Sequence, residues 1–411
     1  MAAPVNPPRG MRDFLPADKG RRERALATIR AVYRAHGFDE IEAPALEESA
    51  RLHSGIGGDN EKLAYNVLKR GLTDADLAAA ADAGDPLALA DLGLRYDLTV
   101  PLARFYATNQ AQLPAVFRAI QIGPVWRAER PQKGRYRQFL QCDIDVLGEP
   151  GAIAELELLS ATTDALAALG LTGVQVRIND RRILNRLLAT WGVGDDAAPR
   201  ALITVDKLDK IGVSGVVGEL AELGVDTSGL DDAFAQLADA GWDLLVDPPA
   251  WLDADAYRDL LALRDALPSV DLVFDPVLVR GMGYYTGTIF EIAHPRSSSS
   301  VGGGGRYDGM IGRFLGRDVP AVGFSIGFER ILDLLPESAA EGTALALLHD
   351  ADVPAPALLA AKREAQALAG RVRLERGRKN RKAQLDALAA EGFTAFATVT
   401  ADGLGEQRPL S

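Results

Sequence analysis

The amino-acid sequence predicts an α+β protein, and three observations lead to this fold class. The segment ending in GPVWRAE and the alternating segment FLQCDIDVLG are predicted strands, and the polar, glycine-containing RPQKGRYRQ between them joins them as an antiparallel hairpin. Residues 181–265 are rich in Leu, Ala and Asp and are expected to be largely helical. Residues 343–411 alternate strand and helix patterns, as a small α/β domain does.

The chain before the hairpin is expected to alternate helices with short strands. Apolar residues on one face predict an amphipathic helix over 18–36, with Gly37 as its stop. The segment FDEIEAPALEE contains a short strand that ends near Pro44. The Ala- and Asp-rich residues 71–92 predict a helical excursion, and LRYDLTVPLARFYA predicts a strand that leads into a helix.

After the hairpin, a helix is expected over 152–169, and strands return in VDLVFDP and YYTGTIFEIAH. VGFSIGFERILDLL predicts a strand that runs into a helix, and PESAAEGT has the composition of a linker. The expected layout is a core in two parts, 1–180 and 266–336, with a helical insertion at 181–265 and a small C-terminal domain at 343–411.

Composition narrows the class of protein. The 411 residues are 47% hydrophobic and 25% charged, the balance of a globular protein with a sizeable core. Cys142 is the single cysteine, so no intramolecular disulfide can form, which fits a reducing compartment. No apolar run approaches a signal peptide or a membrane span. We therefore expect a cytoplasmic protein, and the net charge of −12 argues against a DNA or membrane partner.

Two basic windows run against this acidic average. One is RVRLERGRKNRK at 371–382. The other spans 118–137 and holds a single acid, Glu129, among six bases: Arg118, Arg127, Arg130, Lys133, Arg135 and Arg137. A solvated face is the ordinary explanation of a charge run, but basic clusters in an acidic chain favour anion binding.

The predicted hairpin carries residues suited to a nucleotide. Arg127 and Glu129 have period-two spacing, so they share one face if they lie on a strand. The guanidinium can contact a phosphate and the carboxylate can accept from an exocyclic amine. The competing interpretation is a surface ion pair, which contributes little energy.

The same hairpin also carries residues suited to an amino acid. Arg135 and Arg137 have the same spacing within or beside the loop. The returning strand places an amide and two carboxylates on one face, where they can hold an ammonium group: Gln141, Asp143 and Asp145. Contacts to phosphates and contacts to an ammonium group are both required when ATP reacts with an amino acid.

Two further segments are candidates for substrate contacts. In LRYDLT, Asp97 and Thr99 would share a face of a short strand and could hold an α-ammonium group, although helix capping explains them equally well. In VRGMGYYTGTIFE, Arg280 stands beside glycines. Tyr284 and Tyr285 would point to opposite faces of a strand, and core packing is their commoner role.

Two glycine-punctuated segments complete the candidates. GGGGRYDG, which contains Tyr307, fits a tight substrate loop better than a flexible linker, and it matches neither the P-loop nor the dinucleotide fingerprint. In VGFSIGFER, Arg330 begins a helix, where an exposed arginine is the ordinary alternative.

Metal and nucleophile sites are not indicated. The four histidines have no paired spacing, and one cysteine cannot build a zinc cluster, so no protein metal site is expected.

These segments, in this order, closely resemble the histidyl-tRNA synthetases, a class II aminoacyl-tRNA synthetase family. RGMRDFLP resembles the N-terminal signature, Pro44 the motif 1 proline, and WRAERPQKGRYRQFLQCDIDVLG motif 2. LVRGMGYYTGTIFE and GGGGRYDG resemble the two histidine-specific motifs, and VGFSIGFER resembles motif 3.

The resemblance implies a role for each candidate. Arg127 would bind the α-phosphate, Glu129 the adenine amino group, and Arg330 the adenine and the γ-phosphate. Arg280 would contact the α-phosphate during transfer, which makes Arg127 and Arg280 the catalytic pair. The amino-acid pocket would be formed by Asp97 and Thr99 at the α-amino group, with Arg135, Gln141, Asp145, Tyr284, Tyr285 and Tyr307.

The resemblance also implies a fold, partners and cofactors. The core would be the class II antiparallel sheet flanked by helices, with motif 1 at a homodimer interface. The tail would be an anticodon-binding-like domain. Histidine and tRNA would be the partners, and ATP would be a substrate with Mg²⁺ on its phosphates.

Three features depart from the family pattern. Gly283 stands where an acidic residue is usual, the excursion at 71–92 is longer than the family needs, and the C-terminal domain looks shortened. The leading hypothesis is a histidine–tRNA ligase. Two alternatives stay open: a tRNA-independent amino-acid ligase, and a non-catalytic regulatory subunit of ATP phosphoribosyltransferase.

Overall fold

The computed structural model of the protein comprises two units, Met1–Leu335 and Pro336–Ser411, each described below by itself. Lys133 of the basic window, Met282 of the tyrosine segment and 337–341 of the predicted linker lie outside the described residues. The structure describes residues 5–53, 62–131, 134–281, 283–336 and 342–410.

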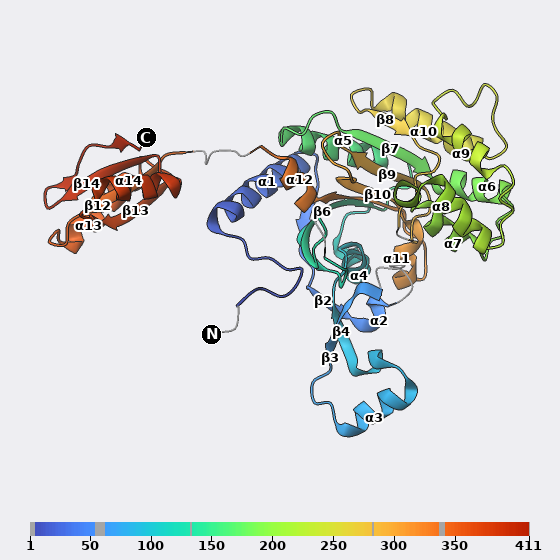
Figure 1. Ribbon diagram of the computed structural model, residues 1–411, viewed down its shortest axis with the longest axis horizontal. Helices are drawn as coiled ribbons and strands as arrows, with labels where there is room; N and C mark the ends of the chain where they lie inside the picture. Colours follow the sequence, from blue (N-terminus) through green and yellow to red (C-terminus); the bar gives the residue numbers. More distant parts are fainter. Residues whose placement is uncertain (1–4, 54–61, 132–133, 282, 337–341, 411) are drawn as a thin grey trace. The chain divides into compact units, whose positions relative to one another are not determined.

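The larger unit is built on one eight-stranded sheet (Figure 1). The strand order is β1-β5-β6-β11-β10-β9-β7-β8. The edge pairs β1–β5 and β7–β8 are parallel, and the pairs between them are antiparallel. In chain order the strands are β1 Asp39–Ile41, β5 Phe117–Trp126, β6 Gln138–Leu147, β7 Gln175–Asp180, β8 Leu272–Phe274, β9 Thr288–Ala293, β10 Gly302–Arg306 and β11 Ala321–Gly327.

The predicted hairpin is present as β5 and β6, which pair antiparallel along their whole length. Apolar and polar residues alternate along β6, and this alternation explains which face of the sheet each side chain occupies. Cys142, Ile144 and Val146 belong to the main apolar core on one face. The polar residues of the strand occupy the other face: Gln141, Asp143 and Asp145. The hairpin therefore separates a helix-covered face from a polar one.

Helices cover the apolar face of the sheet. α1 Pro16–Ala35 packs against α5 Ile153–Ala168, and α10 Ala254–Ala266 and α12 Phe328–Leu334 complete this layer. Both predicted helices of the layer, α1 and α5, are confirmed. Gly37 ends α1 because its φ of 81° is in the left-handed region that glycine adopts without strain.

The polar face of the sheet is only partly covered. α4 Thr99–Asn109 and α11 Asp308–Leu315 pack together over one end of it and share an apolar cluster with Phe117, Tyr307 and Ala321. The remaining area carries the cavity described below. α2 Ser49–Leu52 lies earlier in the chain than α4, and the 3₁₀ turn η3 Gln110–Gln112 follows α4 directly.

The predicted excursion at 71–92 projects from this body on a small antiparallel sheet (Figure 1). The expected helix is α3, and Thr73 and Asp76 close a capping box at its start. The elements of this arm are β2 Leu46–Glu48, β3 Tyr65–Leu68, α3 Asp74–Ala83, the 3₁₀ turn η2 Pro86–Leu89 and β4 Ala90–Leu94.

Residues 181–265, the predicted helical insertion, form helices within the larger unit, and most of these helices share an apolar cluster of their own. α10 instead packs into the main core through Tyr257 and Leu260. The boundary at residue 265 therefore stays a prediction. The helices of the separate cluster are α6 Arg181–Thr190, α7 Ala198–Val205, α8 Leu208–Glu222 and α9 Leu230–Ala238.

The smaller unit is the predicted α/β domain, with β12 parallel to β13 on one side and to β14 on the other. Two short strands, which the sequence analysis did not foresee, pair antiparallel with β14. Among the described helices of the protein, none combines the length and the hydropathy that crossing a membrane requires. The unit's elements are β12 Ala344–His349, α13 Ala355–Gln366, β13 Arg371–Arg376, α14 Arg381–Ala390, β14 Ala395–Thr400, β15 Gly403–Leu404 and β16 Arg408–Pro409.

The interpretation of GGGGRYDG as a substrate loop is wrong for its glycines, because they form the central strand β10. Close packing explains their presence. A Cβ at Gly302 would lie 2.9 Å from Cε1 of Phe324, and a Cβ at Gly304 would collide with the backbone of Gly323. The run therefore lets backbone and side chains approach closely instead of supplying a mobile loop.

Candidate active site

A cavity of about 600 Å³ lies on the polar face of the sheet. It is lined by residues from the hairpin, from β9, β10 and β11, from the start of α12 and from Asp206–Lys210 of the insertion. All of the site residues predicted from the sequence line it: Asp97, Thr99, Arg127, Glu129, Arg135, Gln141, Asp145, Arg280, Tyr284, Tyr285, Tyr307 and Arg330.

β5 ends at Trp126, and Arg127 and Glu129 follow it outside the strand. The prediction that they share a strand face is therefore wrong. The guanidinium Nε of Arg127 donates to the carbonyl of Tyr96 at 2.9 Å, and the group lies 5.1 Å from the ring centroid of Phe139. These contacts aim Arg127 into the cavity. Its partner is not Glu129, so the pair is not the surface ion pair considered above.

Glu129 is paired with Arg135 across the loop, at 3.5 Å. The backbone holds this loop at its base, where the amide of Arg127 donates to the carbonyl of Arg137 at 2.9 Å. One acid and several bases therefore gather at the mouth of the cavity, where a polyanion can be bound.

Arg330 is half-buried, not exposed. Its Nη1 donates to the carbonyl of Ser300 at 2.5 Å, which fixes the guanidinium against the loop before β10. Burial lowers the pKa of Arg330, and the nearby Arg135 and Arg280 lower it further. A bound anion would relieve this repulsion.

Arg280 lies on the glycine strand. A Cβ at Gly303 would be 2.5 Å from its guanidinium carbon, so glycine is required at this position for Arg280 to lie flat on the sheet. Its Nη1 forms an ion pair with Glu291 of β9, and Arg177 of β7 pairs with the other carboxylate oxygen at 3.2 Å. The Nε atom of Arg280 is buried without a hydrogen-bond partner. Burial acts against its charge, but Glu291 leaves its pKa above the ordinary value.

Asp97 and Thr99 were predicted on a strand, but β4 ends at Leu94 and Thr99 is the first residue of α4. Asp97 is 2% exposed, and its Oδ1 accepts from the amide of Val100 at 3.2 Å. Its other oxygen, Oδ2, is buried without a hydrogen-bond partner. Asp97 thus contacts the first turn of a helix with one oxygen and leaves the other for a ligand.

Three buried carboxylates meet at this end of the cavity. Burial raises the pKa of Asp97 to about 6 and that of Asp145 to about 7. Burial also raises the pKa of Asp143, and the neighbouring Asp145 raises it further. Carboxylates arranged in this way favour a cationic ligand, which would stabilise their charged forms.

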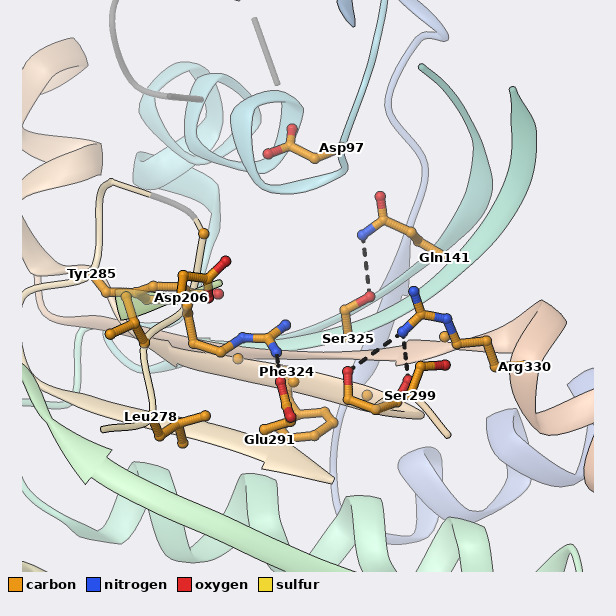
Figure 2. A pocket seen from close by; sticks show the side chains of 18 of the residues that line it. Asp97, Gln141, Asp206, Leu278, Tyr285, Glu291, Ser299, Phe324, Ser325 and Arg330 are labelled. Atoms are coloured by element: carbon orange, nitrogen blue, oxygen red, sulfur yellow. Dashed lines mark hydrogen bonds and ion pairs between the residues drawn. The ribbon is translucent and has the colours of Figure 1, made fainter. Parts of the chain in front are cut away.

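Polar side chains order these carboxylates. Tyr307 donates its hydroxyl to Oδ1 of Asp145 at 2.5 Å. Gln141 donates to the hydroxyl of Ser325 at 3.1 Å, and Figure 2 shows the two side chains facing each other. The amide oxygen of Gln141 is buried without a hydrogen-bond partner, so it too remains available to a ligand.

Tyr284 and Tyr285 lie in a turn before β9, not on a strand, and both line the cavity. The expectation that they point to opposite faces of a strand is therefore wrong. Their ring centroids are 4.8 Å apart, and Tyr284 and Tyr307 are 5.8 Å apart, both edge-on. The three rings form an aromatic wall beside the carboxylates.

The sequence analysis missed several cavity residues. Glu291, Arg177 and Ser325 lie on the polar face of their strands, and Asp206 comes from the insertion. One signal was available for Glu291, since it is a lone charge in the apolar strand TIFEIA. Its pairing with Arg280 depends on strand neighbours distant in sequence.

The comparisons with known proteins agree with this geometry. Residues 10–331 match the family described as Histidyl-tRNA synthetase. A histidine–tRNA ligase of Leifsonia xyli subsp. xyli is 59% identical over 98% of this chain and 97% of its own. The chain belongs to the histidyl-tRNA synthetase family. The resemblance inferred from the motifs is thereby confirmed.

Solved structures of low sequence identity share the fold of this family. A histidyl-tRNA synthetase from Nostoc sp. has a TM-score of 0.75 at 24% identity, covering 100% of this chain and 97% of its own. A structure titled ATP phosphoribosyltransferase regulatory subunit/histidyl-tRNA synthetase, from Bacillus halodurans, has a TM-score of 0.78 at 22% identity, covering 97% and 100%. The predicted class II sheet flanked by helices is confirmed.

Proposed function

We propose that the protein is a histidine–tRNA ligase, which activates histidine with ATP and transfers it to tRNA. One observation carries the proposal: a single cavity is lined by five arginines and, further in, by three buried aspartates. Arginines suit phosphates and carboxylates suit an ammonium group, so the two substrates can meet in one site.

The first step joins the carboxylate of histidine to the α-phosphorus of ATP. An oxygen of the carboxylate attacks in line, the bond to the bridging oxygen breaks, and pyrophosphate leaves with that oxygen. The reaction needs positioning and charge stabilisation more than covalent help. We assign the α-phosphate to Arg127 and Arg280, and the adenine end of ATP to Glu129 and Arg330.

The histidine side of the site selects the amino acid. The free Oδ2 of Asp97, with Thr99 and the free amide oxygen of Gln141, would accept from the α-ammonium group. Tyr307 occupies one oxygen of Asp145, and the other would accept from an imidazole N–H. Arg135, Tyr284 and Tyr285 complete the pocket.

Mg²⁺ would reach the site on the phosphates of ATP. Within the residues that the structure describes, no three His, Cys, Asp or Glu side chains form a group that could hold a metal ion. The described residues therefore do not fit a protein-built Mg²⁺ site, and no step above depends on one.

In the second step a terminal hydroxyl of tRNA would take the histidyl group and AMP would leave, while the smaller unit would bind the RNA. β13 carries Arg371, Arg373 and Arg376, and basic residues continue towards α14, which suits the RNA backbone. We further propose a homodimer and a cytoplasmic setting, as is usual for this family. The two alternative functions are not favoured, because a relative of 59% identity is a histidine–tRNA ligase.

The test is ATP–pyrophosphate exchange with each amino acid in turn, followed by transfer with and without histidine tRNA. Exchange should depend on histidine, and the product should be charged tRNA. Absence of histidine-dependent exchange at saturating ATP would contradict the proposal.

A further inference from the structure

The N-terminal turn that includes Gly10 and Arg12 packs against the loop that enters the cavity. The carbonyl of Gly10 accepts from the amide of Arg137 at 2.8 Å. A Cβ at Gly10 would lie 2.8 Å from Pro131 and 2.9 Å from Arg137, and its φ of 82° also favours glycine. The turn therefore contacts both sides of the loop.

Arg12 connects this loop to a second element of the site. Its guanidinium lies 3.4 Å from the ring centroid of Tyr136, which lines the cavity. The same guanidinium forms an ion pair with Glu329, the residue before Arg330 in α12. Arg12 itself does not line the cavity. It can therefore influence a bound nucleotide only through its neighbours.

Glu329 is a well-anchored partner for this contact. It is 8% exposed, and Arg22 of α1 binds both of its oxygens, at 2.6 and 2.7 Å. Its Oε1 also accepts from the amide of Leu140 in β6 at 3.3 Å. Burial acts to raise the pKa of Glu329, but Arg22 and Arg12 together lower it, so the carboxylate keeps its charge.

We propose that Arg12 is a positioning residue for ATP, which fixes the described part of the loop, residues 127–131 and 134–137, against α12 by joining Tyr136 to Glu329. The inference rests on the proposed function and adds to it a role for the N-terminal turn. The loop contributes Glu129 and Arg135 to the cavity and α12 contributes Arg330. Holding the two together sets the distance between Glu129 and Arg330, the two groups assigned to the adenine end of ATP.

The first experiment measures pyrophosphate exchange for Arg12→Ala. The KM for ATP should rise about fivefold, since a close cation–π contact is lost, while the KM for histidine and kcat should stay within about twofold. In the Tyr136→Ala background, Arg12→Ala should add no further increase. Tyr136→Phe keeps the ring, so Arg12→Ala should still raise the KM for ATP about fivefold in that background.

The matched control is Arg21→Ala. Arg21 bonds the carbonyls of Leu332 and Leu335 at the end of α12, at 2.7 and 2.6 Å, without touching the loop. Arg21→Ala should lower Tm without changing the KM for ATP. If Arg12→Ala changes only Tm in the same way, Arg12 has a structural role and the proposal is overturned.

A second readout does not require catalysis. Trypsin can cut the loop after Arg135, and Arg12→Ala should speed this cut relative to Arg21→Ala, with added ATP protecting less well. Equal rates would overturn the positioning role. A lack of exchange in the unmodified protein would contradict the proposed function alone, because the cleavage comparison still tests the contact.

Discussion

The two ends of the cavity carry groups of opposite charge and differ in how those groups are held. At the mouth, Arg127 and Arg330 donate to backbone carbonyls, and Arg135 is paired with Glu129. At the inner end, Asp97 leaves one carboxylate oxygen without a hydrogen-bond partner, and burial raises its pKa. The arginines at the mouth are therefore held in position before a ligand binds. The carboxylate of Asp97 at the inner end has an oxygen that a cationic ligand can contact.

This difference indicates how each substrate is recognised. Neutral carbonyls orient an arginine without cancelling its charge, so the guanidinium remains attractive to phosphate. A buried carboxylate without a cation is costly, and it lowers that cost by binding a proton. In the proposed reaction the amino acid's ammonium group would replace that proton, which would make the inner end selective for charge as well as shape.

The largest expected effect is at Arg280, which lies between β9 and the glycine strand. Arg280→Ala should lower kcat for pyrophosphate exchange about 10²–10³-fold, the usual effect of removing a preorganised transition-state donor. Arg280→Lys keeps the charge and should restore part of the rate. If kcat is unchanged while the KM for ATP rises, Arg280 binds the ground state only.

Gly303→Ala should give the next largest effect. Its Cβ would lie 2.5 Å from the guanidinium carbon of Arg280, and the end of this flexible side chain can move aside. We expect a roughly 10- to 100-fold loss of kcat from misplacement, with Tm nearly unchanged. Gly309→Ala, where a Cβ meets nothing within 4 Å, is the matched control. A large loss of Tm would mean that Gly303 serves packing instead.

The pH dependence separates the two ends. Asp97 and Asp145 have raised pKa values of about 6 and about 7, so both bind protons as the pH falls from 8 to 5.5. The KM for histidine should then rise about tenfold while the KM for ATP changes little. Histidine itself titrates in this range, so Asp97→Asn is the control and should flatten part of the rise. Parallel changes in both KM values would contradict the distinction.

The smallest expected effect is on stability. The raised pKa of Asp97 means that the folded state binds its proton more tightly than the unfolded state. Its contribution to stability is present below about pH 4 and is lost as the pH rises through about 6. Asp97→Asn should therefore raise Tm by a few degrees at pH 8 and not at pH 4, as thermal unfolding at both pH values can show. A lower Tm at pH 8 would mean that the bond to Val100 dominates.

Several features of the fold could be predicted because they depend on local pattern. Alternation in FLQCDIDVLG gave β6, and it also gave the shared face of Gln141, Asp143 and Asp145. Leu26, Ile29 and Tyr33 gave the buried face of α1. These patterns depend on strand and helix geometry alone.

Other features could not be predicted because they depend on contacts between distant segments. The glycines of β10 have the composition of a loop, and only their neighbours Phe324 and Arg280 explain why they form a strand. Tyr284 and Tyr285 look like strand residues, but they lie in a turn that brings both to Tyr307. The partner of Arg280, Glu291, is likewise set by the order of strands.

The most direct test of the two-ended cavity compares two variants in the same exchange assay. Asp145→Asn should raise the KM for histidine at least tenfold and leave the KM for ATP within about twofold, because it alters only the inner end. Arg330→Leu should do the reverse. If each variant shifts both KM values equally, the two ends do not serve separate substrates, and the account is contradicted.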